Sequence, residues 1–175
     1  YTSGEILVAK NALIHSWMGK LLENNAIDRE YLATAKGELD EVEGVIEEPI
    51  GRSPDSIIER MITPEGQYAK TSYQVLAKLE GYTLVAAKLH TGRTHQIRVH
   101  FDYLGHPLLG DDLYDMPSDL ISRQALHCWR LSFVDPLNGS KIIQTAPIPE
   151  DMKLAIQTLG GVQWLEEDSR KNKKE

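Results

Sequence analysis

Hydrophobic and polar residues alternate along several short stretches of the chain, which is the pattern of half-buried β-strands. These stretches are Ile6 to Ala9, Glu30 to Thr34, Val42 to Ile46, Lys70 to Leu79, Tyr82 to His90, Leu126 to Val134 and Lys141 to Thr145. In the longest one, a single face is expected to carry Thr71, Tyr73, Val75, Ala77 and Leu79. Turn residues at 80–81 and 135–139 predict two β-hairpins, 70–90 and 126–145.

Apolar residues at helical spacing predict three helices. Their apolar faces are formed by Leu13, Trp17, Leu21 and Leu22; by Ile97, Phe101 and Leu104; and by residues 151–159. Asn11 and Thr94 are expected to cap the first two helices, because short polar side chains satisfy the free N–H groups at a helix start. Gly105 and Gly160 are expected to end the second and third helices.

Strands in hairpins with a few intervening helices indicate an α+β domain with a mixed, largely antiparallel central sheet flanked by helices. Pro49, Gly51 and Pro54 predict an irregular connection. The length of 175 residues suits one domain. We assign residues 1–160 to that domain and residues 161–175 to a C-terminal tail.

Composition narrows the class of protein only broadly. The chain is 41% hydrophobic and 26% charged, which is typical of a soluble globular protein, and no apolar run approaches the length of a membrane span. The net charge of −7 argues against promiscuous nucleic-acid binding but is compatible with a local basic groove. Cys128 is the single cysteine, which fits a reducing cytoplasm, and we interpret it as a small core residue.

The densest group of polar residues spans positions 90–100. A strand leads to Gly92 and a helix follows, so free N–H groups beside Arg93 would suit a phosphate. Arg98 lies one turn into this helix, where its guanidinium could bind a functional carboxylate or pair with Asp102 at i+4; the residues alone favour neither. Histidines at 90, 95, 100 and 106 lack the spacing of a helical ligand pair, so we expect no metal site.

One long segment resembles a known family. Residues 91–100 read Thr-Gly-Arg-Thr-His-Gln-Ile-Arg-Val-His, and residues 104–111 read Leu-Gly-His-Pro-Leu-Leu-Gly-Asp. Together they resemble the signature of RluA-type RNA pseudouridine synthases. Segments 2–4, 7–11, 30–33, 49–52 and 69–73 are similar to further parts of that family in the same order, so the resemblance covers about residues 1 to 155.

The resemblance implies the pseudouridine synthase fold and the isomerisation of uridine in structured ribosomal or transfer RNA. It implies no cofactor and no metal, and a cytoplasmic enzyme, expected to be a monomer, whose partner is RNA and not a membrane. In this family an aspartate attacks a uridine that is flipped into a pocket. By position, Arg98 matches the arginine that pairs with this aspartate, and Tyr73 matches the tyrosine beside the flipped base. Candidate substrate contacts are Arg93, Thr94, His95, Gln96 and Leu109.

The resemblance places the nucleophilic aspartate, in a His-Arg-Leu-Asp motif, two residues before Tyr1. We therefore expect the chain as given to be inactive by itself. Asp111 and Asp112 are assigned structural roles. The alternative interpretation is a catalytically inactive RNA-binding or chaperone module with the same fold, in which the aspartate has been replaced.

Overall fold

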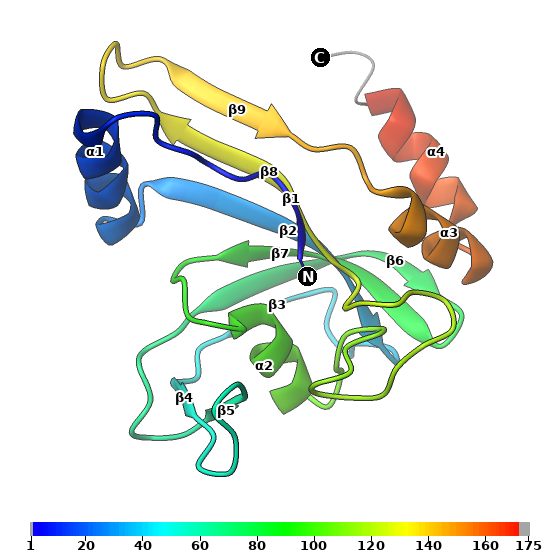
Figure 1. Cartoon of the computed structure of the whole chain (residues 1–175). Helices are drawn as coiled ribbons and strands as arrows, with labels where there is room; N and C mark the ends of the chain where they lie inside the picture. The colour runs from blue at the N-terminus through cyan, green and yellow to red at the C-terminus, as the bar shows by residue number, and fades with distance from the viewer. Residues whose placement is uncertain (1, 172–175) are drawn as a thin grey trace.

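The computed structural model describes residues 2–171 and contains one mixed sheet, a small second sheet and four helices (Figure 1). The large sheet has the strand order β1-β8-β2-β7-β6-β3, with β9 also paired to β8. Its strands are β1 (Ser3–Gly4), β2 (Ile27–Lys36), β3 (Glu43–Ile46), β6 (Thr71–Leu79), β7 (Tyr82–Leu89), β8 (Leu126–Val134) and β9 (Lys141–Thr145). The helices are α1 (Ala12–Glu23), α2 (Gln96–Tyr103), α3 (Glu150–Thr158) and α4 (Val162–Lys171). Within these residues all strand pairs are antiparallel except β1 with β8, so the predicted α+β class is confirmed.

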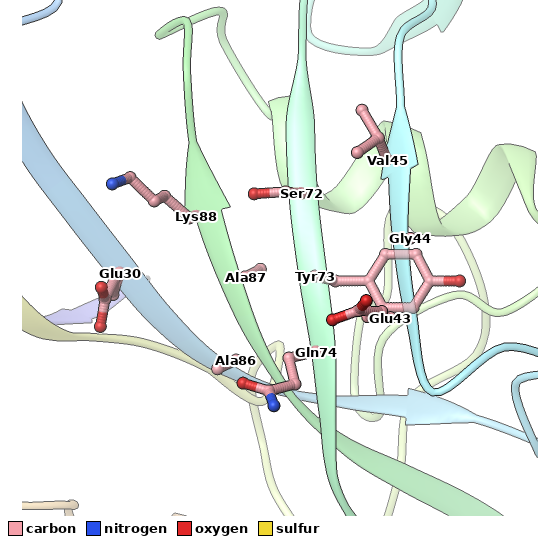
Figure 2. A pocket seen from close by; sticks show the side chains of 10 residues that line it. All are labelled: Glu30, Glu43, Gly44, Val45, Ser72, Tyr73, Gln74, Ala86, Ala87 and Lys88. Atoms are coloured by element: carbon pink, nitrogen blue, oxygen red, sulfur yellow. The ribbon is translucent and has the colours of Figure 1, made fainter.

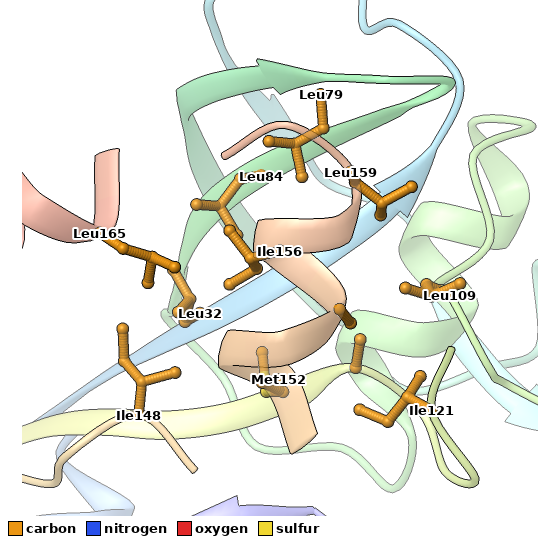
Figure 3. Packing of buried hydrophobic residues seen from close by; sticks show 12 residues of the cluster. Leu32, Leu79, Leu84, Leu109, Ile121, Ile148, Met152, Ile156, Leu159 and Leu165 are labelled. Carbon is orange, nitrogen blue, oxygen red and sulfur yellow. The ribbon is translucent and has the colours of Figure 1, made fainter. Parts of the chain in front are cut away.

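Helices cover both faces of the large sheet (Figure 1). Strand β2 shows how side chains are divided between them, because successive residues of a strand point to opposite faces. Leu32 joins the hydrophobic cluster formed with α3 and α4, whereas Ala33 and Ala35 join the cluster formed with α2. Figure 3 shows the first cluster, in which Met152 and Ile156 of α3 lie over the sheet. The candidate site lies on the other face, on the side of α2.

The expected strand at Ile6 to Ala9 is absent, and this prediction was wrong. Strand β1 ends at Gly4, after which the Glu5 N–H donates to the Cys128 carbonyl at 2.9 Å. From Trp129 onward, the edge of β8 that β1 uses is occupied by the segment that contains β9. The Ala146 N–H donates to the Trp129 carbonyl, and the ladder between β8 and β9 follows. Residues 6–9 therefore find no free edge on β8, and they run across the surface toward α1, which Asn11 caps as predicted.

The prediction that one face of β6 carries all five alternating residues, from Thr71 to Leu79, is also wrong. The pairing between β6 and β7 shifts between Val75 and Ala77, so one residue is bulged out of the ladder. A bulge reverses the alternation of the side chains that follow it. Tyr73 and Val75 consequently pack in the cluster with α2, whereas Ala77 and Leu79 pack in the cluster with α3.

Three further elements differ from the sequence prediction. The connection around Pro49 and Pro54 contains a small hairpin, β4 (Ile50–Arg52) paired with β5 (Arg60–Ile62). Residues 162–171 form α4, in which Leu165 is buried against the cluster with α3; residues 172–175 of the expected tail lie outside the described part of the chain. Helix α2 begins after His95, so Thr94 is not its cap.

Substituting alanine for Gly4 is expected to disrupt the join between β1 and β8. Gly4 has φ of 118°, and a Cβ atom there would lie 2.1 Å from the Cys128 carbonyl oxygen. Gly81 also has a positive φ, of 71°, but no heavy atom lies within 4 Å of its Cβ position. We therefore expect Gly4→Ala to lower the free energy of unfolding by about 2 kcal/mol more than Gly81→Ala, as measured by chemical denaturation. Equal losses of stability in the two variants would mean that the positive φ, and not the clash with Cys128, sets the cost of a side chain at Gly4.

Candidate active site

A pocket of about 240 Å³ lies where the N-terminal run, β2, the start of α2 and the loop before β8 meet. Its lining includes Thr2, Tyr31, Arg93, His95, Arg98 and Gln124. The pairing of β1 with β8 holds the N-terminal run in place, since Ser3 lies opposite His127 and their side chains are 2.9 Å apart. Thr2 and Arg98, which lie far apart in the sequence, thus line one pocket.

Arg98 is held by a buried carboxylate, and this carboxylate is that of Asp111. Arg98 donates from Nε to Oδ2 of Asp111 at 2.7 Å and from one terminal nitrogen to Oδ1 at 2.5 Å. The side chain of Asp111 is fully buried, and its Oδ1 also accepts from the backbone N–H groups of Leu113 and Tyr114. Asp111 therefore has the structural role that the sequence suggested. The interpretation of Arg98 as a surface partner of Asp102 was wrong.

The guanidinium of Arg98 keeps hydrogen-bonding capacity toward the pocket. It carries five N–H groups, and Asp111 uses two of them. The ring of Tyr114 lies against the same group, with its centroid 4.9 Å from the central carbon of the guanidinium. Asp111 and Tyr114 therefore fix the orientation of a cation whose remaining edge can meet a second anion.

Three of the expected substrate contacts are placed differently by the structure. Gln96 lines the pocket, but it is buried, and its side-chain amide is occupied by hydrogen bonds to protein groups: Thr91, the Arg93 N–H, the Lys70 carbonyl and Thr71. Leu109 is buried in the cluster with α3, on the opposite side of the sheet. Thr94 is exposed in the turn before α2 and does not line the pocket. These residues shape the loop and the core, so their geometry offers no support for direct contact with a substrate.

Arg93 and His95 also line the pocket. Arg93 donates from Nε to the carbonyl of Tyr68 at 2.8 Å, which fixes the stem of its guanidinium at the pocket rim. Its expected role toward phosphate stays a prediction. The imidazole of His95 lies 3.0 Å from the Tyr114 hydroxyl through its Nδ1 atom.

Tyr73 does not share the pocket of Arg98. Its ring packs against Phe101, with 5.6 Å between the ring centroids, and lies close beneath Gly44, where a Cβ atom would clash with it. It borders a separate open hollow of about 500 Å³ at the β3–β6 edge of the sheet (Figure 2). Its role beside the base, which the sequence resemblance implied, stays a prediction.

Tyr31 is the tyrosine that lines the pocket, and sequence reasoning did not select it. It lies two strands away from Tyr73 on the same face, because both residues pair with Ala87 of the strand between them. Burial, reinforced by the neighbouring Cys128 thiol, raises the pKa of Tyr31 to about 12, so its hydroxyl is neutral near pH 7. The sequence signal was present in the similar segment 30–33, but a strand tyrosine by itself does not reveal which pocket it faces.

The four histidines that invited a metal interpretation make separate hydrogen bonds. Their partners are Ser72 for His90, Tyr114 for His95, Thr71 for His100 and the Lys36 carbonyl for His106. Within residues 2–171, no three His, Cys, Asp or Glu side chains are arranged to hold a metal ion.

Comparison with known proteins identifies the family. The family model described as RNA pseudouridylate synthase matches residues 1–103, which is more than half of the chain. The chain therefore belongs to this family, and the resemblance to RluA-type enzymes is confirmed.

Relatives in bacteria carry corresponding names. The chain is 48% identical over 156 residues to the "Uncharacterized RNA pseudouridine synthase YjbO" of Bacillus subtilis, covering 89% of this chain and 55% of that protein. It is 37% identical over 167 residues to the "Ribosomal large subunit pseudouridine synthase D" of Nitrosomonas europaea, covering 90% of this chain and 48% of that protein. The chain thus spans about half the length of these relatives.

Solved structures confirm the fold. The human RNA Pseudouridylate Synthase Domain Containing 1 superposes with a TM-score of 0.71 at 24% identity, covering 89% of this chain and 74% of that one. The expected pseudouridine synthase fold is therefore confirmed. No helix within residues 2–171 has the length and apolar character to cross a membrane.

Proposed function

We propose that this protein acts as an RNA pseudouridine synthase on structured ribosomal or transfer RNA. The observation that carries the proposal is the meeting of Thr2 and Arg98 in one pocket. An aspartate two residues before Tyr1 would lie three residues from Thr2, a reach of at most about 11 Å along the chain. Arg98, fixed by Asp111, is the cation that such a carboxylate would meet.

In this mechanism the target uridine is flipped out of the RNA into the pocket. The aspartate attacks the nucleotide, and the bond between N1 of uracil and the sugar breaks. The uracil rotates and rejoins the same sugar carbon through C5, while the bond to the aspartate breaks and the carboxylate is regenerated. C5 then loses its proton and N1 gains one. Arg98 orients the attacking carboxylate and stabilises its charge.

Tyr31 is our candidate for the residue that faces the flipped base. Its ring borders the pocket and its hydroxyl is neutral, so it offers an apolar face together with one polar atom. Tyr73, the tyrosine indicated by the sequence, borders a different hollow on the same sheet. If Tyr31 faces the base, a substitution of Tyr31 should inactivate the enzyme; if Tyr73 does, a substitution of Tyr73 should.

The identity of the residue encoded two positions before Tyr1 is the first test of the proposal. An aspartate in a His-Arg-Leu-Asp motif supports an enzyme, whereas a different residue supports the inactive RNA-binding module. With the aspartate present, ribosomal RNA or tRNA transcripts should gain pseudouridine, detected by carbodiimide labelling and mass spectrometry. Absence of product on both RNA classes would contradict the proposal.

Replacing Arg98 with lysine should reduce turnover in such an active protein by at least about 100-fold, because an ammonium group lacks the fork that binds two carboxylates at once. Arg123 offers a matched control, since it also binds an aspartate, Asp151, through two nitrogens, at 2.8 and 2.9 Å. Arg123→Lys should leave turnover unchanged. Activity of Arg98→Lys within about tenfold of the parent protein would refute the role of Arg98.

A further inference from the structure

His95 has a backbone conformation that is unusual for a residue with a side chain. Its φ is 59°, in the left-handed region, and Asn25 is the only other non-glycine residue with positive φ in the described part of the chain. His95 stands at the N-cap position of α2, yet its side chain makes no capping hydrogen bond. Glycine would adopt this backbone without cost, so the helix start does not explain the imidazole.

The imidazole is instead held by a short relay of hydrogen bonds. The backbone N–H of Arg60 donates to the Tyr114 hydroxyl at 2.9 Å, and that hydroxyl lies 3.0 Å from Nδ1 of His95. With the Arg60 N–H donating to the hydroxyl oxygen, the hydroxyl completes the relay by donating its own proton to Nδ1, the arrangement on which the proposal for His95 rests. Nδ1 then carries no proton, so the neutral ring carries its proton on Nε2.

The surroundings of His95 favour this neutral form. Its pKa is lowered by burial and by the positive charges of Arg98 and Arg60. The pKa of Tyr114 is raised, chiefly by burial, so its hydroxyl keeps the proton that it donates. His95 is therefore an uncharged donor near pH 7.

The residue that carries this donor borders the pocket. His95 lines the pocket that also contains Tyr31 and Arg98, whereas Tyr114 lies outside it and borders a different hollow beside the β4–β5 hairpin. Nδ1 is engaged by Tyr114, so Nε2 is the ring nitrogen of His95 that remains to donate to a molecule in the pocket. The ring packs edge-on against Tyr114 at 89°, which limits its rotation.

We propose that His95 recognises the flipped base as uracil, its Nε2–H donating a hydrogen bond to the C4 carbonyl oxygen. Cytosine presents an amino group at this position, and a donor held against another donor leaves both unpaired in a partly buried site. The inference rests on the proposed function, because it requires a pyrimidine in this pocket. It gives the chain a means of discriminating between the two pyrimidines of RNA.

The test uses the full 175-residue chain and free nucleotides, so it does not depend on catalysis. Nitrogen-15 NMR of His95 should show the proton on Nε2 in the parent protein. Uridine 5′-monophosphate should shift the Nε2 resonance, and cytidine 5′-monophosphate should shift it much less. A proton on Nδ1, equal shifts with both nucleotides, or no shift with either would overturn the proposal.

Two variants separate recognition from a structural role. His95→Gly and His95→Asn both suit the left-handed backbone, but only asparagine retains an N–H donor. We expect His95→Gly to remove the preference for uridine monophosphate, weakening its binding by about tenfold without loss of thermal stability. His95→Asn should restore part of that preference. If the glycine variant binds both nucleotides like the parent protein, His95 does not read the base.

Discussion

Replacing Asp111 with asparagine is expected to lower the free energy of unfolding by about 3–5 kcal/mol, which is the usual cost of leaving one member of a buried ion pair without its partner. The side chain of Asp111 is fully buried and that of Arg98 is 10% exposed, so water has poor access to the side of the guanidinium that Asp111 covers. The substitution also weakens the acceptor used by the N–H groups of Leu113 and Tyr114. Chemical denaturation of parent and variant measures the difference.

Asp112 provides the matched control, because it is the next residue and is exposed. Asp112→Asn should change the free energy of unfolding by no more than about 0.5 kcal/mol. A second substitution tests the cause of the loss. Adding Arg98→Met to Asp111→Asn should recover part of the stability, since no unpaired buried charge then remains. A loss below about 1 kcal/mol for Asp111→Asn would mean that the ion pair is not a structural element of the site.

Replacing Tyr31 with phenylalanine should reduce pseudouridine formation by about 100-fold or more in a protein that carries the nucleophilic aspartate. Phenylalanine keeps the ring against the pocket but removes the hydroxyl, the polar atom that Tyr31 presents to the base. Affinity for RNA should change little, because the ring surface remains. Product formation and RNA binding are measured separately, by mass spectrometry and by a filter or mobility assay.

Tyr73→Phe is the control for this experiment. The ring of Tyr73 packs on Phe101, outside the pocket of Arg98. Removal of the Tyr73 hydroxyl should therefore leave turnover close to that of the parent protein. The opposite result, an active Tyr31→Phe and an inactive Tyr73→Phe, would support the assignment that the sequence resemblance implied. Equal losses of turnover and RNA binding in Tyr31→Phe would indicate a packing role.

The fold class, the two hairpins and three of the helices followed from the sequence because they depend on local patterns. Alternation from Tyr82 to His90 and helical spacing in residues 13–22 are set by neighbouring side chains. The motif at 91–100 pointed to the family, and it included Arg98 and His95, which line the candidate pocket. The need of Arg98 for a carboxylate partner also followed from the residues.

The tertiary structure decided which carboxylate binds Arg98 and which tyrosine lines the same pocket. Asp111 lies thirteen positions from Arg98, and the two meet only because the loop after α2 folds back beneath the helix. Whether Tyr31 or Tyr73 reaches the pocket depends on the strand order. Tyr31 lies on β2, which is beside β8, whereas Tyr73 lies on β6, which is separated from β8 by β2 and β7. Occupation of the β8 edge by β9 and the bulge in β6 are likewise contacts between distant segments, and periodicity along the chain carries no information about them.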